Sequence, residues 1–137
     1  MSLLLKVSGK AALTYVIDGS GVPIETGLKG HLQVPFNCRV ERVILLADGE
    51  DSIQVDIWRS TLENFPPSES DSITGGNAPR ISFGDSYEDA ELEDWERALN
   101  EGDILAFNVD SVGGPMGFRE DGGPMTRVTV SLQVRKT

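Results

Sequence analysis

The chain has 137 residues, enough for one domain that buries a hydrophobic core. Its 12 Lys and Arg residues against 22 Asp and Glu residues give a net charge of −10, which disfavours contact with nucleic acid or an anionic membrane surface. A single cysteine excludes an internal disulfide framework, and the short leucine run near Met1 is too short for a signal peptide or a transmembrane segment. We therefore expect a soluble protein that is made in a cytoplasm.

Alternation of apolar and polar residues with a period of two is the clearest pattern in the sequence. In chain order, the predicted strands cover residues 13–18, 28–34, 38–47, 52–58, 80–83, 103–110 and 126–135. The segment 38–47 changes phase near Glu41, which indicates a bulge or a strand buried on both faces, and Asp48-Gly49 is expected to end it in a turn. Strands with one wet face are typical of antiparallel sheets. We predict an all-β fold in a single domain over residues 1–137: an antiparallel, jelly-roll-like β-sandwich of about eight strands.

The segment 86–100 has two interpretations. Leu92, Trp95 and Leu99 have helical spacing, and Ser86 is a plausible N-cap, so a short amphipathic helix is possible. The surrounding β patterns favour a strand followed by a turn instead. Residues 85–96 also include seven acids, which are expected to form a solvated face or a patch that meets a basic neighbour.

Motifs for catalysis or for cofactor binding are missing from the sequence. His31 is the only histidine, and the GxSxG, CxxC and HExxH patterns do not occur. Cys38 lies in an apolar run and is expected to be a buried structural thiol. We assign no catalytic, cofactor-binding or metal-binding residue and expect that the protein is not an enzyme. A calcium site at the carboxylates of Asp48–Asp51 stays an alternative to a solvated turn, although Arg59 breaks the EF-hand pattern.

The segment 110–125 is interpreted as an inserted hairpin loop. It contains the sequence Gly-Gly-Pro-Met twice, and it is much longer than the usual hairpin connection. Glycine pairs followed by proline favour sharp corners, which would present apolar side chains on the surface. The partner-contact candidates in or next to this loop are Met116, Phe118, Arg119, Met125 and Arg127. A mobile loop without a partner is the alternative.

Trp58 is a further candidate for partner contact. It is opposite in phase to the apolar residues Ile53, Val55 and Ile57 of its predicted strand, so its side chain is expected to leave the core. It would then meet another subunit or pack under the corner formed by 65–67. Trp95, by contrast, is expected in the core.

The order of several short motifs resembles a β-sandwich module of tailed-bacteriophage virion proteins. The motifs, which extend over about residues 16–136, are VPFNC (34–38), VDIW (55–58), FPP (65–67), DSIT (71–74), GDIL (102–105), FNVDS (107–111) and TRVT (126–129). The sequence departs from the module in two places. It has the inserted segment 112–125, and it has Asp94 before Trp95 where the module often has glycine.

The resemblance implies a structural role in a virion, with assembly in the host cytoplasm. Because the module begins near Met1 without a fibre stem, we expect a capsid-surface decoration (cement) protein, and a tail-fibre or baseplate tip that recognises a host receptor or glycan is the alternative. The implied partners are the major capsid protein or other virion proteins. The resemblance also implies a homotrimer, because trimers suit the three-fold and quasi-three-fold positions of an icosahedral shell and closed symmetry is the rule for homo-oligomers.

Overall fold

The computed structural model describes residues 9–113 and 123–137 of the chain. The candidate residues Met116, Phe118 and Arg119 lie outside the described residues. The strands are β1 (Lys10–Asp18), β2 (Gly27–Gln33), β3 (Cys38–Ser60), β4 (Arg80–Asp89), β5 (Ala98–Leu99), β6 (Ile104–Val112) and β7 (Arg127–Lys136), and a short 3-10 helix, η2 (Glu69–Asp71), precedes β4.

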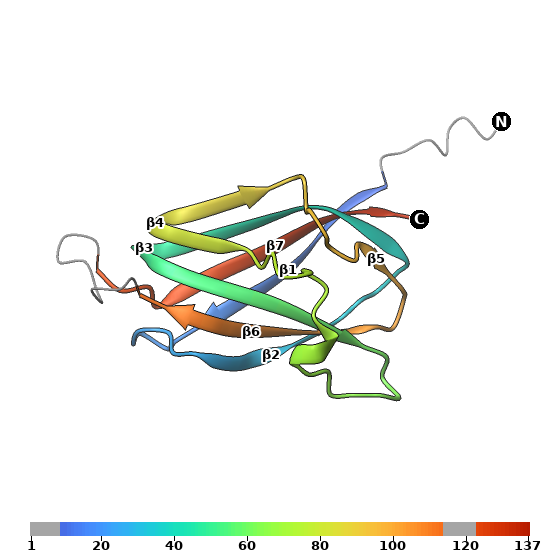
Figure 1. Cartoon of the computed structure of the whole chain (residues 1–137), viewed down its shortest axis with the longest axis horizontal. Helices are drawn as coiled ribbons and strands as arrows, with labels where there is room; N and C mark the ends of the chain where they lie inside the picture. Colours follow the sequence, from blue (N-terminus) through green and yellow to red (C-terminus); the bar gives the residue numbers. More distant parts are fainter. Residues whose placement is uncertain (1–8, 114–122) are drawn as a thin grey trace.

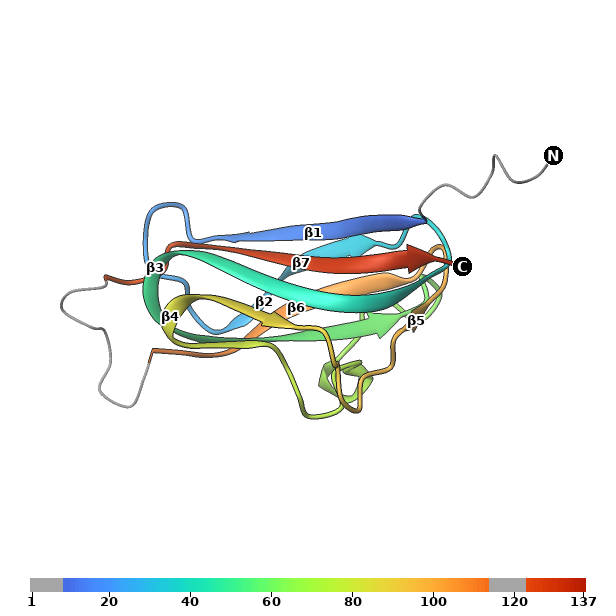
Figure 2. The ribbon, with the colours of Figure 1, turned by 90° about the horizontal axis from the view of Figure 1, so that it is seen from above.

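The seven strands form one antiparallel sheet in the order β1-β7-β3-β6-β2, and β4 and β5 pair with the other side of β3. Figures 1 and 2 show that the sheet curls back on itself. Strands β1 and β7 and the first half of β3 make one layer, and β2, β6 and the second half of β3 make the other. The predicted antiparallel, sandwich-like all-β fold is therefore confirmed, with both layers belonging to a single sheet.

Strand β3 joins the two layers. The sequence predicted two strands separated by a turn at Asp48-Gly49, but the backbone stays extended from Cys38 to Ser60. Its first half pairs with β7 and its second half with β6, and the register against β4 shifts between Leu46 and Asp51. The predicted turn is thus a bend inside a long strand. The predicted bulge is confirmed, since the register against β7 shifts between Val40 and Arg42.

The segment 86–100 is strand and turn, so the helical alternative is wrong. Residues 86–89 belong to β4, and Leu92 and Trp95 are buried from the turns that follow. Leu92 and Asp94 have φ angles of 48° and 66°, which no α-helix accommodates. The backbone at Asp94 is therefore left-handed, a conformation that glycine adopts more readily than other residues.

Apolar side chains from both layers form one buried cluster. Phe107 lies fully buried in β6, and its ring stacks on Tyr15 of β1 with centroids 4.6 Å apart. Cys38 and Trp95 belong to this cluster, as the sequence predicted. Among the residues that the structure describes, no helix has the length and apolar character needed to cross a membrane.

Tyr15 also bridges the open side of the curled sheet, where the end strands β1 and β2 face each other. Its hydroxyl donates a hydrogen bond of 2.9 Å to the Lys29 carbonyl. A Cβ atom at Gly30 would lie 1.9 Å from the Tyr15 hydroxyl oxygen. Because the Tyr15 ring is held against Phe107, it has little freedom to retreat. Glycine at position 30 therefore permits the two edges to close.

Replacing Gly30 with alanine is expected to lower the free energy of unfolding by about 2 kcal/mol, because the new methyl group overpacks against a fixed ring. Urea denaturation followed by tryptophan fluorescence measures the change. Gly9→Ala is the matched control, since a Cβ atom there would meet nothing closer than 3.6 Å. Equal stability of the two variants would contradict the packing argument.

Candidate functional site

Both described feet of the inserted loop lie at one end of the sandwich. Figure 2 shows this end, where the bend of β3, the β1–β2 connection and the ends of β6 and β7 come together. We call it the loop end and define it by residues 18–24, 48–52, 111–113 and 123–127. Every segment of the loop end hydrogen-bonds to at least one of the others.

Asp48, at the bend of β3, fixes the foot of the loop that leads into β7. Its carboxylate accepts hydrogen bonds from the backbone N–H groups of Thr126, at 2.8 Å, and Arg127, at 3.0 Å, and from the Thr126 hydroxyl. Desolvation acts to raise the pKa of Asp48, but these hydrogen bonds to the charged form outweigh it and hold the pKa below its ordinary value. Asp48 is therefore a structural anchor for this foot.

Gly49 allows the same foot to approach the bend closely. A Cβ atom at position 49 would lie 2.3 Å from the Pro124 carbonyl oxygen, too close for any other residue without a backbone shift. The neighbouring backbone is tied in as well, because the Thr126 carbonyl accepts from Gly19 N–H at 2.7 Å and the Met125 carbonyl accepts from Ile24 N–H at 3.0 Å. The second Gly-Gly-Pro-Met copy thus packs onto the body of the sandwich.

Ser52 fixes the other foot. Its carbonyl accepts a hydrogen bond of 2.7 Å from Gly113 N–H, and its hydroxyl accepts one of 2.9 Å from Phe83 N–H in β4. Gly113 and Gly123, on either side of the undescribed segment, have φ angles of 74° and 72°. Glycine is favoured at both positions because this left-handed region strains other residues.

Met125 is the candidate that the structure contradicts. The sequence predicted a surface contact, but its side chain is only 5% exposed and belongs to the core cluster. The foot of the loop turns inward there because its backbone is bound to Ile24 and its neighbour Thr126 to Asp48. Met125 therefore anchors the loop from inside instead of contacting a partner.

Arg127 is exposed at the loop end, as predicted for a contact residue. Its guanidinium lies 3.8 Å from the Asp18 carboxylate, and both side chains are largely solvated. An exposed ion pair of this kind contributes little to stability. Its side chain therefore remains accessible for contact with another protein.

Trp58 lies in the second half of β3, away from the loop end, so it does not join the other candidates. Its side chain is half-buried, and its indole N–H donates a hydrogen bond of 3.1 Å to Asp56. A backbone bridge pairs Trp58 with Ser72. The structure thus gives Trp58 an intrachain role in holding the 61–79 connection.

Asp56 of β3 holds that connection by hydrogen bonds. Its carboxylate, on a residue only 8% exposed, accepts hydrogen bonds from the hydroxyls of Ser72, at 2.7 Å, and Thr74, at 2.8 Å, as well as from Trp58. These three hydrogen bonds offset the free-energy cost of burying a carboxylate. The motifs VDIW and DSIT, which are separate in sequence, therefore form one hydrogen-bonded unit.

The carboxylates of Asp48–Asp51 do not act together. Asp48 is used by Thr126 and Arg127, whereas Asp51 is buried at 3% exposure and accepts from the N–H of Ser52. Within residues 9–113 and 123–137, no group of three or more His, Cys, Asp or Glu residues is arranged to hold a metal ion. The geometry therefore does not favour a calcium site. It also differs from a fully solvated turn, because Asp48 and Asp51 each accept hydrogen bonds from the chain itself.

Cys38 and His31 do not form a reactive pair. Burial, followed by the charge of Asp103, raises the pKa of the Cys38 thiol, which disfavours the nucleophilic thiolate. His31 is exposed on β2, where its ring meets Phe65 edge-on at 4.9 Å. The two side chains thus belong to different environments.

A polar groove of about 480 Å³ lies between β4 and the turns around residues 76–78 and 91–93. Amides, hydroxyls, carboxylates and one guanidinium line it, including those of Asn77, Arg80, Ser82 and Asp89. Tyr87 contributes the aromatic ring, and its pKa is raised by burial and by Asp89, so the phenol stays protonated. The sequence analysis did not single out this groove, although all of its lining residues except Gln54 lie within residues 76–93.

The anchoring residues Asp48, Ser52, Asp56 and Thr126 were not identified from the sequence as a group. Two weak signals existed: Asp48 falls at an expected strand end, and Asp56 interrupts an apolar strand. Apart from Trp58, which is two residues from Asp56, their partners are 16–79 residues away in sequence, so only the folded chain shows the pairing.

Comparison with known proteins gave no match: no family model, no curated protein and no solved structure is similar to this chain. The geometry and the sequence motifs therefore carry the functional argument.

Replacing Asp48 with asparagine is expected to destabilise the protein by about 1 kcal/mol at neutral pH, an amount reduced by the solvent exposure of the group. Because the folded-state pKa of Asp48 is lowered, its contribution is complete above the unfolded-state pKa of about 3.9 and is lost as the pH falls through the folded-state value. Thermal unfolding from pH 7 down to pH 2 should show the two proteins converging in acid. Glu50→Gln, at an exposed neighbour, is the control and should match the wild type throughout.

Proposed function

We propose that the protein is a non-catalytic structural protein of a bacteriophage virion, which decorates the capsid surface and binds the shell through its loop end. The observation that carries the proposal is the anchoring of both feet of the inserted loop. Asp48, Ser52, Gly49 and Met125 hold these feet on the sandwich by hydrogen bonds, close packing and burial. Pre-organised attachment lowers the entropy that a binding loop loses on contact.

The motif order supports the virion assignment. Two of the motifs that resemble the phage module, VDIW and DSIT, meet through Asp56, Ser72 and Thr74. The position at which the module often has glycine has a left-handed backbone here, at Asp94. These features give the shared motifs a common structural purpose in the sandwich, while the inserted loop is the part that differs and is free to specify a partner.

The residues proposed to touch the shell are Arg127, at the described foot, and Met116, Phe118 and Arg119, within the segment between the feet. Arginine, methionine and aromatic residues are enriched in protein interfaces. Added contact area between adjacent capsid subunits would then reinforce the shell. The major capsid protein is the proposed partner, and no cofactor is required.

A tail-fibre or baseplate tip that binds a host glycan is the second candidate, and the polar groove beside Tyr87 favours it. Sugars are recognised by directional polar groups together with an aromatic ring, and the groove contains both. The two candidates differ in copy number, because a decoration protein covers the shell whereas a tip occurs only at the tail.

Quantitative densitometry of purified particles is expected to give hundreds of copies per virion, since contacts with every shell facet are implied. A few to about eighteen copies would instead support the tail assignment, as expected for tail symmetries. Absence from purified particles would contradict both.

The triple substitution Met116→Ser, Phe118→Ser and Arg119→Ser is expected to weaken binding to particles that lack the protein by at least about tenfold, because it removes the apolar and cationic contacts. Co-sedimentation measures the occupancy. Leu62→Ser is the control, because this residue is 67% exposed on a connection away from the loop end. Unchanged occupancy of the triple variant would refute shell binding through the loop.

A further inference from the structure

Strand β1 lies at one end of the sheet and pairs with another strand on one side only. In the strand order β1-β7-β3-β6-β2, its only strand partner among the described residues is β7. Figure 2 shows β1 along the margin of the first layer. Tyr15 reaches β2 through its side chain, by the hydrogen bond to the Lys29 carbonyl, and not through its backbone. The second side of β1 therefore has no strand partner in the part of the chain that the structure describes.

The backbone groups on this second side belong to alternate residues of β1. Gly9 and Gly19, which flank the strand, both bond to the β7 side: the Gly9 carbonyl accepts from Lys136 N–H and Gly19 N–H donates to the Thr126 carbonyl, each at 2.7 Å. The register between β1 and β7 has no shift, and in an antiparallel ladder residues directed toward a neighbour alternate with residues directed away from it. Even-numbered residues therefore direct their N–H and C=O groups away from β7. We define the outer edge of β1 by three of them, Ala12, Thr14 and Val16.

The outer edge has none of the features that usually protect an edge strand from pairing with another chain. Such features are charged residues, proline, a bulge or a very short strand. Residues 11–17 contain no charged residue, no proline and no glycine, and the strand has nine residues in an unbroken register. Val16 is apolar, and yet it is 44% exposed. Strand β1 is therefore suited to accept a further strand.

The strands at the other edges of the described sheet are protected. Strand β2 contains Gly27 and Gly30, and its register shifts between Leu28 and Gly30. Strand β5 has only two residues. Glycine, bulges and short length all weaken strand pairing, so these strands are poor templates for another chain.

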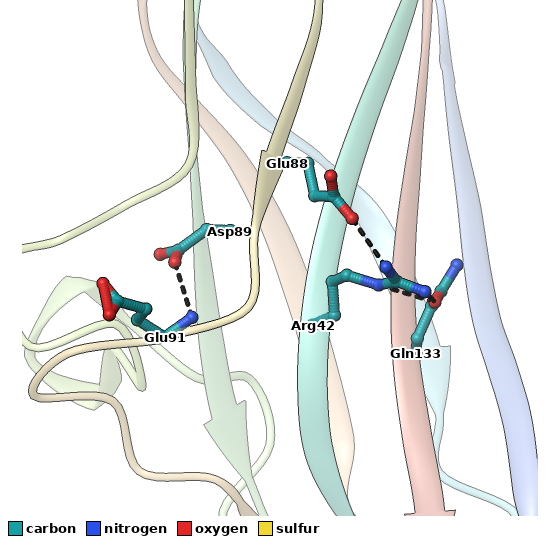
Figure 3. Close-up of polar contacts among 5 residues, drawn as sticks. All are labelled: Arg42, Glu88, Asp89, Glu91 and Gln133. Atoms are coloured by element: carbon teal, nitrogen blue, oxygen red, sulfur yellow. Dashed lines mark hydrogen bonds and ion pairs between the residues drawn. The ribbon is translucent and has the colours of Figure 1, made fainter.

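Strand β4 is protected by charge, and its charged end also stiffens the first layer. Glu88 of β4 lies 2.6 Å from Arg42 of β3, and Arg42 donates two hydrogen bonds to the Gln133 side chain of β7, at 2.9 and 2.6 Å (Figure 3). Asp89 accepts a hydrogen bond of 2.9 Å from Glu91 N–H, which ends the strand in a turn. These contacts tie β4, β3 and β7 together, so the layer that ends in β1 is pre-organised for the addition of a strand.

The sequence of β1 is complementary to itself in one antiparallel register. When Thr14 of one copy lies opposite Thr14 of another, Ala12 of each copy lies opposite Val16 of the other. These are the residues of the outer edge, so each opposed pair can exchange two backbone hydrogen bonds. Their side chains all face away from the core, where the two Thr14 hydroxyls can pair and Ala12 can cover the apolar surface of Val16.

The same register brings no like charges together. It places Lys10 of one copy opposite Asp18 of the other at both ends of the ladder. The contact does not require either residue to lack another partner, and Asp18 already lies 3.8 Å from Arg127. A shift by two residues would shorten the ladder and set a charged residue opposite Ala12 or Val16. The strand therefore favours the register that is centred on Thr14.

We propose that two copies of the protein pair through the outer edges of β1, antiparallel and with Thr14 on the two-fold axis, so that their first layers become one continuous sheet. Addition of a strand to an exposed edge is a common mode of protein recognition, and the contact here is isologous. A two-fold contact gives a dimer, in contrast to the homotrimer that the resemblance implies. The inference goes beyond the proposed function, because it concerns contacts between copies and the outer edge lies outside the loop end.

The test uses the position of Thr14 opposite itself. Thr14→Lys places two ammonium groups across the two-fold axis, and Thr14→Asp places two carboxylates there. Each variant is expected to self-associate at least about tenfold more weakly than the wild type in sedimentation equilibrium, because like charges directly opposite repel. An equimolar mixture of the two variants should associate to within about threefold of the wild type, because unlike charges then face each other. This recovery is specific to the proposed register.

Ser86→Lys and Ser86→Asp are the matched controls, at an exposed position of β4 on the far side of the first layer. Alone and mixed, they should self-associate like the wild type. Circular dichroism should show that every variant is folded, and Thr14→Glu replaces Thr14→Asp if the aspartate prevents folding.

Amide hydrogen exchange of the wild type tests the ladder without any substitution. Exchange of Thr14 N–H should slow as the protein concentration rises through the range of association, because this group gains a partner across the two-fold axis. Tyr15 N–H is directed toward β7 in the single chain, so its exchange should not respond to concentration.

A wild-type protein that remains monomeric at about 0.1 mM, where a specific contact of useful strength would be occupied, overturns the proposal. A trimer also overturns it, because pairing of two identical edges gives a dimer. The same holds for unchanged association of Thr14→Lys, for a mixture that does not recover, and for exchange at Thr14 that is independent of concentration. Particle binding by the loop variants tests the proposed function separately, since it involves the loop end and not the outer edge.

Discussion

The structure depends on one constraint: apolar side chains on one face of a single sheet must be buried against one another. With no α-helix among the described residues to cover that face, the sheet buries it by curling. Strand β3 makes this possible because it continues through its bend, with β7 paired to its first half and β6 to its second half. The close approach of Gly49 to Pro124 and the hydrogen bond that the Asp48 carboxylate accepts from Thr126 then hold the bend against the foot of the inserted loop.

The proposed binding surface lies at one end of the curled sheet, where several connecting segments are gathered. The bend, the β1–β2 connection and the loop feet gather at one end, which is why contacts with another molecule are proposed there.

The sequence predicted the strands well where one face is wet, as in β7, since alternation there is uninterrupted. It predicted poorly at 48–51, because Asp-Gly normally marks a turn and nothing local shows that one strand continues from its pairing with β7 to its pairing with β6. Helical spacing of Leu92 and Trp95 was misleading, since both are buried from a loop with left-handed residues. Met125 was misplaced because burial depends on Ile24 and other residues that are about 100 positions away, and the same distance concealed the Asp48 and Asp56 networks.

The pairing of β1 with β7 has a mechanical consequence. Residues 9 and 136 are hydrogen-bonded neighbours at one end of the antiparallel β1–β7 pair, with the Gly9 carbonyl accepting from Lys136 N–H at 2.7 Å. Tension applied between these two points would load the ladder one rung at a time, because the strands are peeled apart from that end instead of sheared along their length. A protein held by its loop end and loaded from the opposite end would instead resist along the strand axes, where the rungs share the force.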